Sequence, residues 1–255
     1  MKLVFFDIDG TLAHGKNVPA SAEEGLRQLR ANDNLVFICT GRNPVYAQKN
    51  FGRYADGFIC CNGRLAVRDS EILYAHPLDQ DQIRDLMDRL DAVEGGYCFL
   101  GLEEGWYGGN PKGFEVMASV QDPGFVKNGI RDNMTAYSLD IYMVSADRVN
   151  VMRKALEGVA LVNPHGPHPS ADITVLGVDK GTALVHVAEK LGVTIDDTYA
   201  FGDGVNDVCM LEAAGHGVAM GNAVPETKAA AEYITTNIDQ DGVYNGLKHY
   251  GRIEG

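Results

Sequence analysis

The chain opens with a segment that reads Leu3-Val4-Phe5-Phe6-Asp7-Ile8-Asp9-Gly10-Thr11. Its four consecutive apolar residues are typical of a strand that is covered on both faces in a parallel sheet. Two aspartates follow at once, and Gly10 then permits a tight turn. Taken alone, the Asp-x-Asp pattern could equally form an Asx-turn. Because open α/β sheets bind ligands beyond the carboxyl ends of their strands, the segment also predicts a ligand site.

Segments typical of buried strands alternate with segments typical of amphipathic helices at both ends of the chain. A capping box at residues 21–24 predicts a helix start, and Asp179 predicts a second one, with Gly192 ending that helix. The sequence therefore indicates a doubly wound α/β domain with a parallel sheet. The other strands and helices that we expect in it are strands 35–39, 58–61, 198–201 and 218–220, and helices 205–214 and 225–231.

The middle of the chain follows a different pattern. Apolar and polar residues alternate over 137–144, which predicts a half-buried, antiparallel strand. Helical periodicity at 83–90 and 149–156 flanks a glycine-rich stretch at 95–113 that favours a hairpin. We expect a second α/β domain over residues 80–177, inserted into a core made of residues 1–79 and 178–255.

Composition excludes several classes of protein. The 255 residues include 35 acidic and 22 basic side chains, for a formal net charge of −13, which argues against a nucleic-acid partner. No window approaches the roughly 18 uncharged apolar residues of a spanning helix, so no membrane role is expected. Five cysteines without CxxC spacing indicate neither a disulfide framework nor a zinc site. A soluble cytoplasmic protein with no obligate protein partner is the expectation.

Three further polar segments fall at predicted element ends. These are Thr40-Gly41-Arg42 after the second strand, Gly202-Asp203-Gly204-Val205-Asn206-Asp207 after a C-terminal strand, and Lys180 in the first turn of a helix. Each has an ordinary explanation as a loop or a solvated side chain. Their joint placement at strand and helix ends predicts that they lie together with Asp7 and Asp9.

Four aspartates in one site would repel one another, which would raise their pKa values unless a cation neutralised them. Hard carboxylate oxygens without histidine or cysteine ligands favour Mg²⁺, which commonly binds one or two carboxylates and a substrate phosphate. Thr40, Lys180 and the backbone N–H groups of the Gly10 and Gly41 turns would then hold phosphate oxygens.

Together these segments resemble the four motifs of the haloacid dehalogenase superfamily, and in particular its Cof-type sugar-phosphate phosphatases. The resemblance covers both flanks, at residues 1–79 and 178–255, and extends to Gly217-Val218-Ala219-Met220-Gly221-Asn222-Ala223 and Asp241-Gly242-Val243. The middle matches in placement and size the large α/β cap of such proteins. The resemblance thus implies a Rossmann-like core with an inserted cap that sets substrate specificity.

The resemblance also implies a mechanism. Asp7 would attack phosphorus and form an aspartyl-phosphate, while Asp9 would protonate the leaving oxygen and later deprotonate the attacking water. The implied ligands of Mg²⁺ are Asp7, the backbone carbonyl of Asp9, and Asp203.

The remaining motif residues would hold the phosphoryl group. Thr40 and Lys180 would contact its oxygens, with Asn206 beside them, and Asp207 would orient Lys180 or a metal-bound water. In the cap, Trp106, Tyr107, Arg131, His165 and His168 could face a substrate, but for each of them a packing or surface role is the favoured interpretation.

The sequence therefore predicts a Mg²⁺-dependent phosphatase acting on small phosphomonoesters, with sugar phosphates as the leading class. Two alternatives stay open. A phosphomutase would use the same aspartyl-phosphate but would need a bisphosphate activator. A non-enzymatic receiver-like module would be phosphorylated on an aspartate for signalling.

Overall fold

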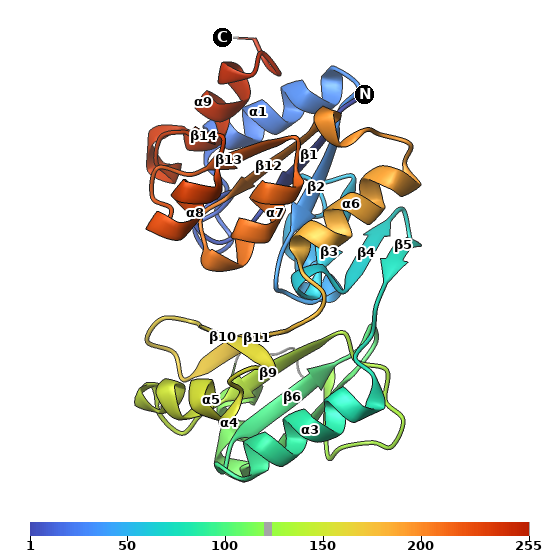
Figure 1. The fold of residues 1–255 in the computed structure, drawn as a ribbon, viewed down its shortest axis with the longest axis vertical. Helices are drawn as coiled ribbons and strands as arrows, with labels where there is room; N and C mark the ends of the chain where they lie inside the picture. The colour runs from blue at the N-terminus through green and yellow to red at the C-terminus, as the bar shows by residue number, and fades with distance from the viewer. Residues whose placement is uncertain (120–123, 255) are drawn as a thin grey trace. The chain divides into compact units, whose positions relative to one another are not determined.

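The computed structural model describes residues 1–119 and 124–254, and the chain divides into two compact units (Figure 1). The core unit comprises Met1–Ala75 and Val178–Gly255, and the inserted unit comprises His76–Gly177. The sequence placed the first boundary between residues 79 and 80, slightly later in the chain.

The core unit is built on an eight-stranded sheet in which β1 occupies the point where the strand order reverses. From β14 to β3 all neighbours are parallel, and β4 and β5 extend the edge as an antiparallel hairpin. In spatial order the strands are β14 (Tyr233–Ile234), β13 (His216–Ala219), β12 (Thr198–Gly202), β1 (Leu3–Phe6), β2 (Leu35–Cys39), β3 (Gly57–Cys60), β4 (Leu65–Arg68) and β5 (Glu71–Ala75).

Helices cover both faces of this sheet, as its continuous apolar strands require (Figure 1). One face carries α6, α7 and α8, and the other carries α1 and α9. The helices of the core unit are α1 (Ala20–Ala31), α2 (Pro44–Phe51), α6 (Lys180–Lys190), α7 (Val208–Ala213), α8 (Pro225–Ala230) and α9 (Gly242–His249). The doubly wound α/β fold expected from the sequence is confirmed.

Aromatic side chains fix the centre of the core unit. The rings of Phe6 and Phe201 stack at 4.9 Å between β1 and β12, and those of Phe5 and Phe37 lie 5.5 Å apart between β1 and β2. All four side chains are fully buried. Burial of this kind stabilises by about 1.5–3 kcal/mol per large apolar side chain. The strand ends that carry the polar motifs therefore project from a rigid centre.

Two helices of the core unit, α2 and α6, begin at residues whose side chains cap them. Asn43 and Asp179 cap α2 and α6 through their side chains, as N-cap residues commonly do. The predicted capping box at residues 21–24 is wrong, because α1 already begins at Ala20, after Pro19. Proline fixes φ in a range suited to the approach to a helix, and Ser21 consequently lies inside the first turn.

The inserted unit contains a six-stranded sheet in which only β7 and β8 pair in parallel. Its strands, in spatial order, are β10 (Ala160–Pro164), β11 (Ser170–Val175), β9 (Ser138–Tyr142), β6 (Gly96–Leu100), β7 (Gly105–Gly109) and β8 (Val126–Asn128). Its helices are α3 (Gln80–Asp91), α4 (Pro111–Ala118) and α5 (Val149–Ala155).

The half-buried strand expected at 137–144 is β9, residues 138–142, which is antiparallel as predicted but is buried along its whole length. Leu139 and Ile141 join the apolar cluster under α3 and α5, while Tyr142 belongs to a second cluster with Met117 of α4. Because both faces are covered, the polar Asp140 is buried too, and it accepts a hydrogen bond from the Tyr142 hydroxyl. Alternate residues of β9 face two different apolar clusters, and neither face of the strand is open to solvent.

Within the described part of the chain, no helix has both the length and the apolar character needed to cross a bilayer.

Candidate active site

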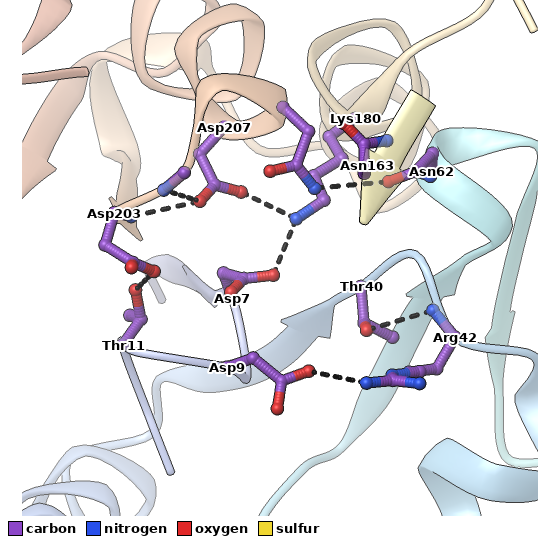
Figure 2. Close-up of polar contacts among 12 residues, drawn as sticks. Asp7, Asp9, Thr11, Thr40, Arg42, Asn62, Asn163, Lys180, Asp203 and Asp207 are labelled. Carbon is purple, nitrogen blue, oxygen red and sulfur yellow. Dashed lines mark hydrogen bonds and ion pairs between the residues drawn. The ribbon is translucent and has the colours of Figure 1, made fainter. Parts of the chain in front are cut away.

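The polar motifs of the core unit meet at the carboxyl ends of its central strands (Figure 2). Asp7 follows β1, Thr40 follows β2, Asp203 follows β12, and Lys180 is the first residue of α6. These strands are neighbours around the reversal at β1, where open α/β sheets commonly bind ligands. The sheet thus brings together residues more than 170 positions apart in the sequence, as between Asp7 and Lys180.

Lys180 lies between two carboxylates (Figure 2). Its Nζ donates to Oδ1 of Asp7 and to Oδ1 of Asp207, each at 2.6 Å. The lysine side chain is only 1 % exposed, and Asp207 is fully buried. A buried charge needs paired partners to offset the loss of water. This arrangement supplies them, and when both carboxyl groups are ionised the group of three carries one excess negative charge.

The surroundings shift the pKa of each titrating group here. Burial, and then the carboxylate of Asp207, raise the pKa of Asp7 to about 8, although Lys180 acts in the opposite direction. Burial alone would lower the pKa of Lys180, but Asp207 and Asp7 together raise it well above its ordinary value. The lysine is therefore a permanent cation that faces a carboxyl group poised to gain or lose a proton.

Asp207 also shapes the loop that carries Asp203. Its Oδ2 accepts the backbone N–H groups of Asp203 at 3.0 Å and Gly204 at 2.9 Å. The Asp207 carboxylate thus accepts hydrogen bonds both from Lys180 and from the loop after β12. This connection supports the orienting role implied for Asp207 by the resemblance.

Asp203 lies near Asp7, beside the loop that follows β1. Thr11 donates its hydroxyl to Asp203 Oδ1 at 2.9 Å, and burial followed by the charge of Asp207 raises the pKa of Asp203 to about 6. A Cβ at Gly10 would stand 2.3 Å from Asp203 Oδ2, so only glycine allows this approach. The φ of Gly10 is +87°, a second reason for glycine.

One of the backbone N–H groups of the turn expected to hold phosphate, that of Gly10, has a partner within the protein. That N–H donates to the carbonyl of Ala13 at 3.1 Å and is engaged within its own turn. The sequence could not show this, because the β1 loop folds back on itself through a bridge between Asp9 and Ala13. Gly10 also makes room for the Asp203 carboxylate.

Asp9 and Thr40 occupy the outer side of the site. Asp9 is half exposed, and its Oδ2 lies 3.3 Å from the Arg42 guanidinium (Figure 2). Thr40 is buried, and its Oγ accepts the backbone N–H of Arg42 at 3.1 Å, which shapes the turn at Gly41. The hydroxyl hydrogen is thus directed away from that turn.

A cation fits this arrangement. Asp7, Asp203 and Asp207 each offer a carboxylate oxygen within 4.8 Å of the others, and in residues 1–119 and 124–254 no other group of three or more His, Cys, Asp or Glu does so. The donors are all hard oxygens, which suits Mg²⁺ better than a softer metal. Burial and then the charge of Asp207 raise the pKa of Asp203, and a cation bound beside these carboxylates would act in the opposite direction.

The candidates in the inserted unit divide into two groups. Trp106 and Tyr107 are buried in the apolar clusters of that unit, which agrees with their packing interpretation. Arg131 is exposed and forms an ion pair with Glu104. The two side chains enter different clusters because successive residues of a strand covered on both faces point in opposite directions.

The two histidines form a small polar network with Ser170. Nδ1 of His165 and Nδ1 of His168 each lie 2.7 Å from the Ser170 Oγ, and His165 Nε2 lies 2.9 Å from Asp172. The network connects β10 to β11 and gives these residues a structural role at the hairpin.

Sequence reasoning missed Asn62, which follows β3 and reaches the same site. Its Oδ1 accepts the amide N–H of Asn206 at 3.4 Å (Figure 2). The available signal was the Asn-Gly dipeptide at a strand end, a strong turn marker.

The comparisons with known proteins agree with this geometry. The family model for haloacid dehalogenase-like hydrolases matches residues 4–247. The Bacillus subtilis (strain 168) protein named "Putative phosphatase YkrA" is 33% identical over 269 residues, with 99% of each chain covered. The 5-amino-6-(5-phospho-D-ribitylamino)uracil phosphatase YcsE of the same organism is 27% identical over 98% of this chain and 96% of its own.

Among solved structures, the sugar phosphatase BT4131, described as a member of subclass IIB, superposes with a TM-score of 0.80. It is 26% identical, and the match covers 99% of this chain and 100% of that one. Polar residues at the carboxyl edge of a doubly wound α/β sheet form a common kind of ligand site. The chain belongs to the haloacid dehalogenase-like hydrolases. The family, the fold class and the hydrolase activity expected from the sequence are therefore confirmed.

Proposed function

We propose that the protein is a Mg²⁺-dependent phosphatase that hydrolyses small phosphomonoesters through an aspartyl-phosphate on Asp7. The observation that carries this proposal is the buried lysine held between Asp7 and Asp207 beside Asp203, in a chain of this hydrolase family. Sugar phosphates are the leading substrate class, and the cytoplasm is the expected location.

Asp7, Asp203 and the backbone carbonyl of Asp9 would hold the metal. Bound there, Mg²⁺ would neutralise the carboxylates and the phosphate so that the anionic substrate can approach an acidic protein. This agrees with the short separation of the Asp7 and Asp203 carboxylates and with their raised pKa values.

In the first step the Asp7 carboxylate attacks phosphorus in line, and the bond from phosphorus to the leaving oxygen breaks. Lys180 holds Asp7 Oδ1, which fixes the direction of attack, and its charge attracts the phosphoryl oxygens. Asp9 gives its proton to the leaving oxygen, so that an alcohol departs. Thr40 and Asn206 would contact the transferring oxygens.

In the second step water attacks phosphorus and the bond to Asp7 breaks. Asp9, now ionised, takes the proton of the water, which restores the acid for the next cycle. The balance is one ester and one water consumed, with one alcohol and one phosphate released. The charge of Lys180 is present throughout, because its pKa is far above neutral pH.

The decisive variant is Asp7→Asn, assayed for phosphate release from p-nitrophenyl phosphate. An amide keeps the shape and its oxygen can accept from Lys180, but it cannot form the acyl phosphate. We expect the rate to fall at least about thousandfold, with circular dichroism unchanged. EDTA should abolish release and Mg²⁺ should restore it. A rate near that of the wild type, or activity insensitive to EDTA, would contradict the proposal.

The same assay separates the alternatives. Release of phosphate without any bisphosphate supports a phosphatase, while transfer that requires a bisphosphate would favour a phosphomutase. The family assignment favours an enzyme over a receiver-like module. A panel of about a hundred phosphate esters, including sugar phosphates and phosphoribityl compounds, would identify the substrate class.

A further inference from the structure

We propose that the loop Cys61-Asn62-Gly63, which follows β3, is a positioning element that sets the geometry of the phosphate site. Asn62 orients the amide of Asn206, and Gly63 seats the start of α6, where Lys180 lies. This proposal rests on the proposed function, because both target residues are assigned to phosphate binding there.

The backbone of this loop adopts a rare conformation. Cys61 and Asn62 have φ values of 56° and 50°, and Gly63 follows at 99°, so three consecutive residues lie in the left-handed region. Asparagine adopts this conformation more readily than most residues, but it is uncommon for cysteine, and three such residues in succession need support from their surroundings. We therefore examined which contacts hold the loop in this conformation.

Two backbone hydrogen bonds connect the loop to the turn that follows β2. The N–H of Cys61 donates to the carbonyl of Arg42, and the N–H of Asn62 donates to the carbonyl of Thr40, both at 3.1 Å. The left-handed run directs both N–H groups to this neighbouring turn. The loop is thereby fixed relative to Thr40.

The side chain of Asn62 reaches the loop after β12. It is 5 % exposed, and its Oδ1 accepts from Asn206 Nδ2 at 3.4 Å (Figure 2). An amide nitrogen carries two N–H groups. With one directed to Asn62, the plane of the Asn206 amide is set, and the second N–H stays available for a phosphoryl oxygen.

Gly63 packs against the residue that caps α6. A Cβ at this position would lie 1.9 Å from the carbonyl oxygen of Asp179 and 2.8 Å from the backbone nitrogen of Lys180. Only glycine permits so close a contact, and its positive φ adds a second requirement. One short loop thus contacts the Thr40 turn, the Lys180 helix and the Asn206 loop.

A double-mutant cycle tests the role of the side chain. Asn62→Gly removes the amide and keeps the left-handed backbone, Asn206→Ala removes its partner, and the third protein carries both changes. We would measure kcat/KM with p-nitrophenyl phosphate, and the Kd for inorganic phosphate by calorimetry. Asn133→Gly is a matched control, because Asn133 also has a left-handed backbone, at φ 56°, but lies in the inserted unit.

We expect Asn62→Gly to lower kcat/KM about tenfold and to weaken phosphate binding, while the melting temperature stays within a few degrees. The double variant should be no worse than Asn206→Ala, since residues that act as one unit are not additive. Asn133→Gly should match the wild type. The proposal would be overturned if the losses of the two single variants multiplied in the double variant. It would also be overturned if kcat/KM of Asn62→Gly stayed within twofold of the wild type.

The two readouts separate this proposal from the proposed function. If the wild type releases no phosphate from any ester, the proposed function fails, and the cycle on phosphate affinity still decides whether Asn62 acts through Asn206. If turnover is normal and both cycles are additive, the positioning role fails alone.

Discussion

At the scale of the residue, Asp9 differs from the other aspartates of the site in its exposure. Asp7 and Asp207 are buried around Lys180, whereas the Asp9 side chain is half exposed and paired with Arg42. An acid that serves a leaving group has to face the side from which substrates enter and leave. Exposure also means that its ion pair contributes little to stability.

We predict that Asp9→Asn lowers kcat about 10²–10⁴-fold, the usual contribution of general acid–base catalysis. The loss should be greater for a sugar phosphate than for p-nitrophenyl phosphate, because a poor leaving group depends more on protonation. Steady-state kinetics with both esters measures this difference, and urea unfolding should show little change.

A matched control is Asp85→Asn, which removes another exposed aspartate–arginine pair, with Arg89 at 2.8 Å on α3. It should retain wild-type rates with both esters. Equal losses for the two esters in Asp9→Asn would show that Asp9 does not protonate the leaving group.

The sequence predicted a site residue when its side-chain chemistry and its place at a strand or helix end both pointed to the site. It did not predict residues whose role depends on contacts between distant parts of the chain. Asp7 and Lys180 follow recognisable strand and helix ends, so the sequence placed them correctly beside each other. Asn62 acts through a partner 144 positions away, which no local pattern encodes. The hydrogen bond from the Gly10 N–H to the Ala13 carbonyl could not be inferred from spacing either.

At the scale of the element, the residue that caps α6 and stabilises its first turn lies next to a residue of the site. Asp179 Oδ1 accepts the N–H of Thr182 at 2.8 Å and its hydroxyl at 3.0 Å, one residue before the buried lysine. We predict that Asp179→Ala lowers the free energy of unfolding by about 1 kcal/mol, as loss of an N-cap commonly does. It should also weaken phosphate binding, because Lys180 occupies the first turn.

Asp79→Ala provides the comparison, since Asp79 caps α3 in the inserted unit through a complete capping box. Urea unfolding should show a similar loss of stability, and calorimetry should show unchanged phosphate affinity. If both variants bind phosphate like the wild type, the cap of α6 has no bearing on the site.

Elements were predictable when one local signal dominated. The continuous apolar run Leu35–Cys39 is β2 residue for residue, because a strand covered on both faces leaves no ambiguity. In β9, residues 139 and 141 alternate with polar neighbours that are buried all the same, because α4 covers the second face. That helix is adjacent in space only, so the burial of Asp140 could not be foreseen.

At the scale of the whole molecule, a net charge of −13 opposes the binding of an anionic ester. The conflict is resolved locally if the carboxylates of Asp7 and Asp203 share a divalent cation. In the metal-free protein these groups have pKa values of about 8 and about 6, against an ordinary value of 3.8. Raised values mean that the folded state holds protons more tightly than the unfolded state. Their stabilising effect is complete below about pH 3.8 and is lost as pH rises through about 6 and then about 8.

Magnesium binding should therefore depend on pH in a defined direction. The ion binds ionised carboxylates, so at pH 5 it must displace protons, and at pH 8.5 it meets carboxylates that repel one another. We predict that saturating Mg²⁺ raises the melting temperature of the protein more at pH 8.5 than at pH 5, since stabilisation follows affinity. Thermal unfolding between pH 5 and 8.5, with and without Mg²⁺, measures the shift. Asp203→Asn should remove the response at every pH, whereas Asp196→Asn, an exposed aspartate outside the site, should keep it. A shift in melting temperature that is the same from pH 5 to 8.5 would show that these carboxylates do not bind the metal.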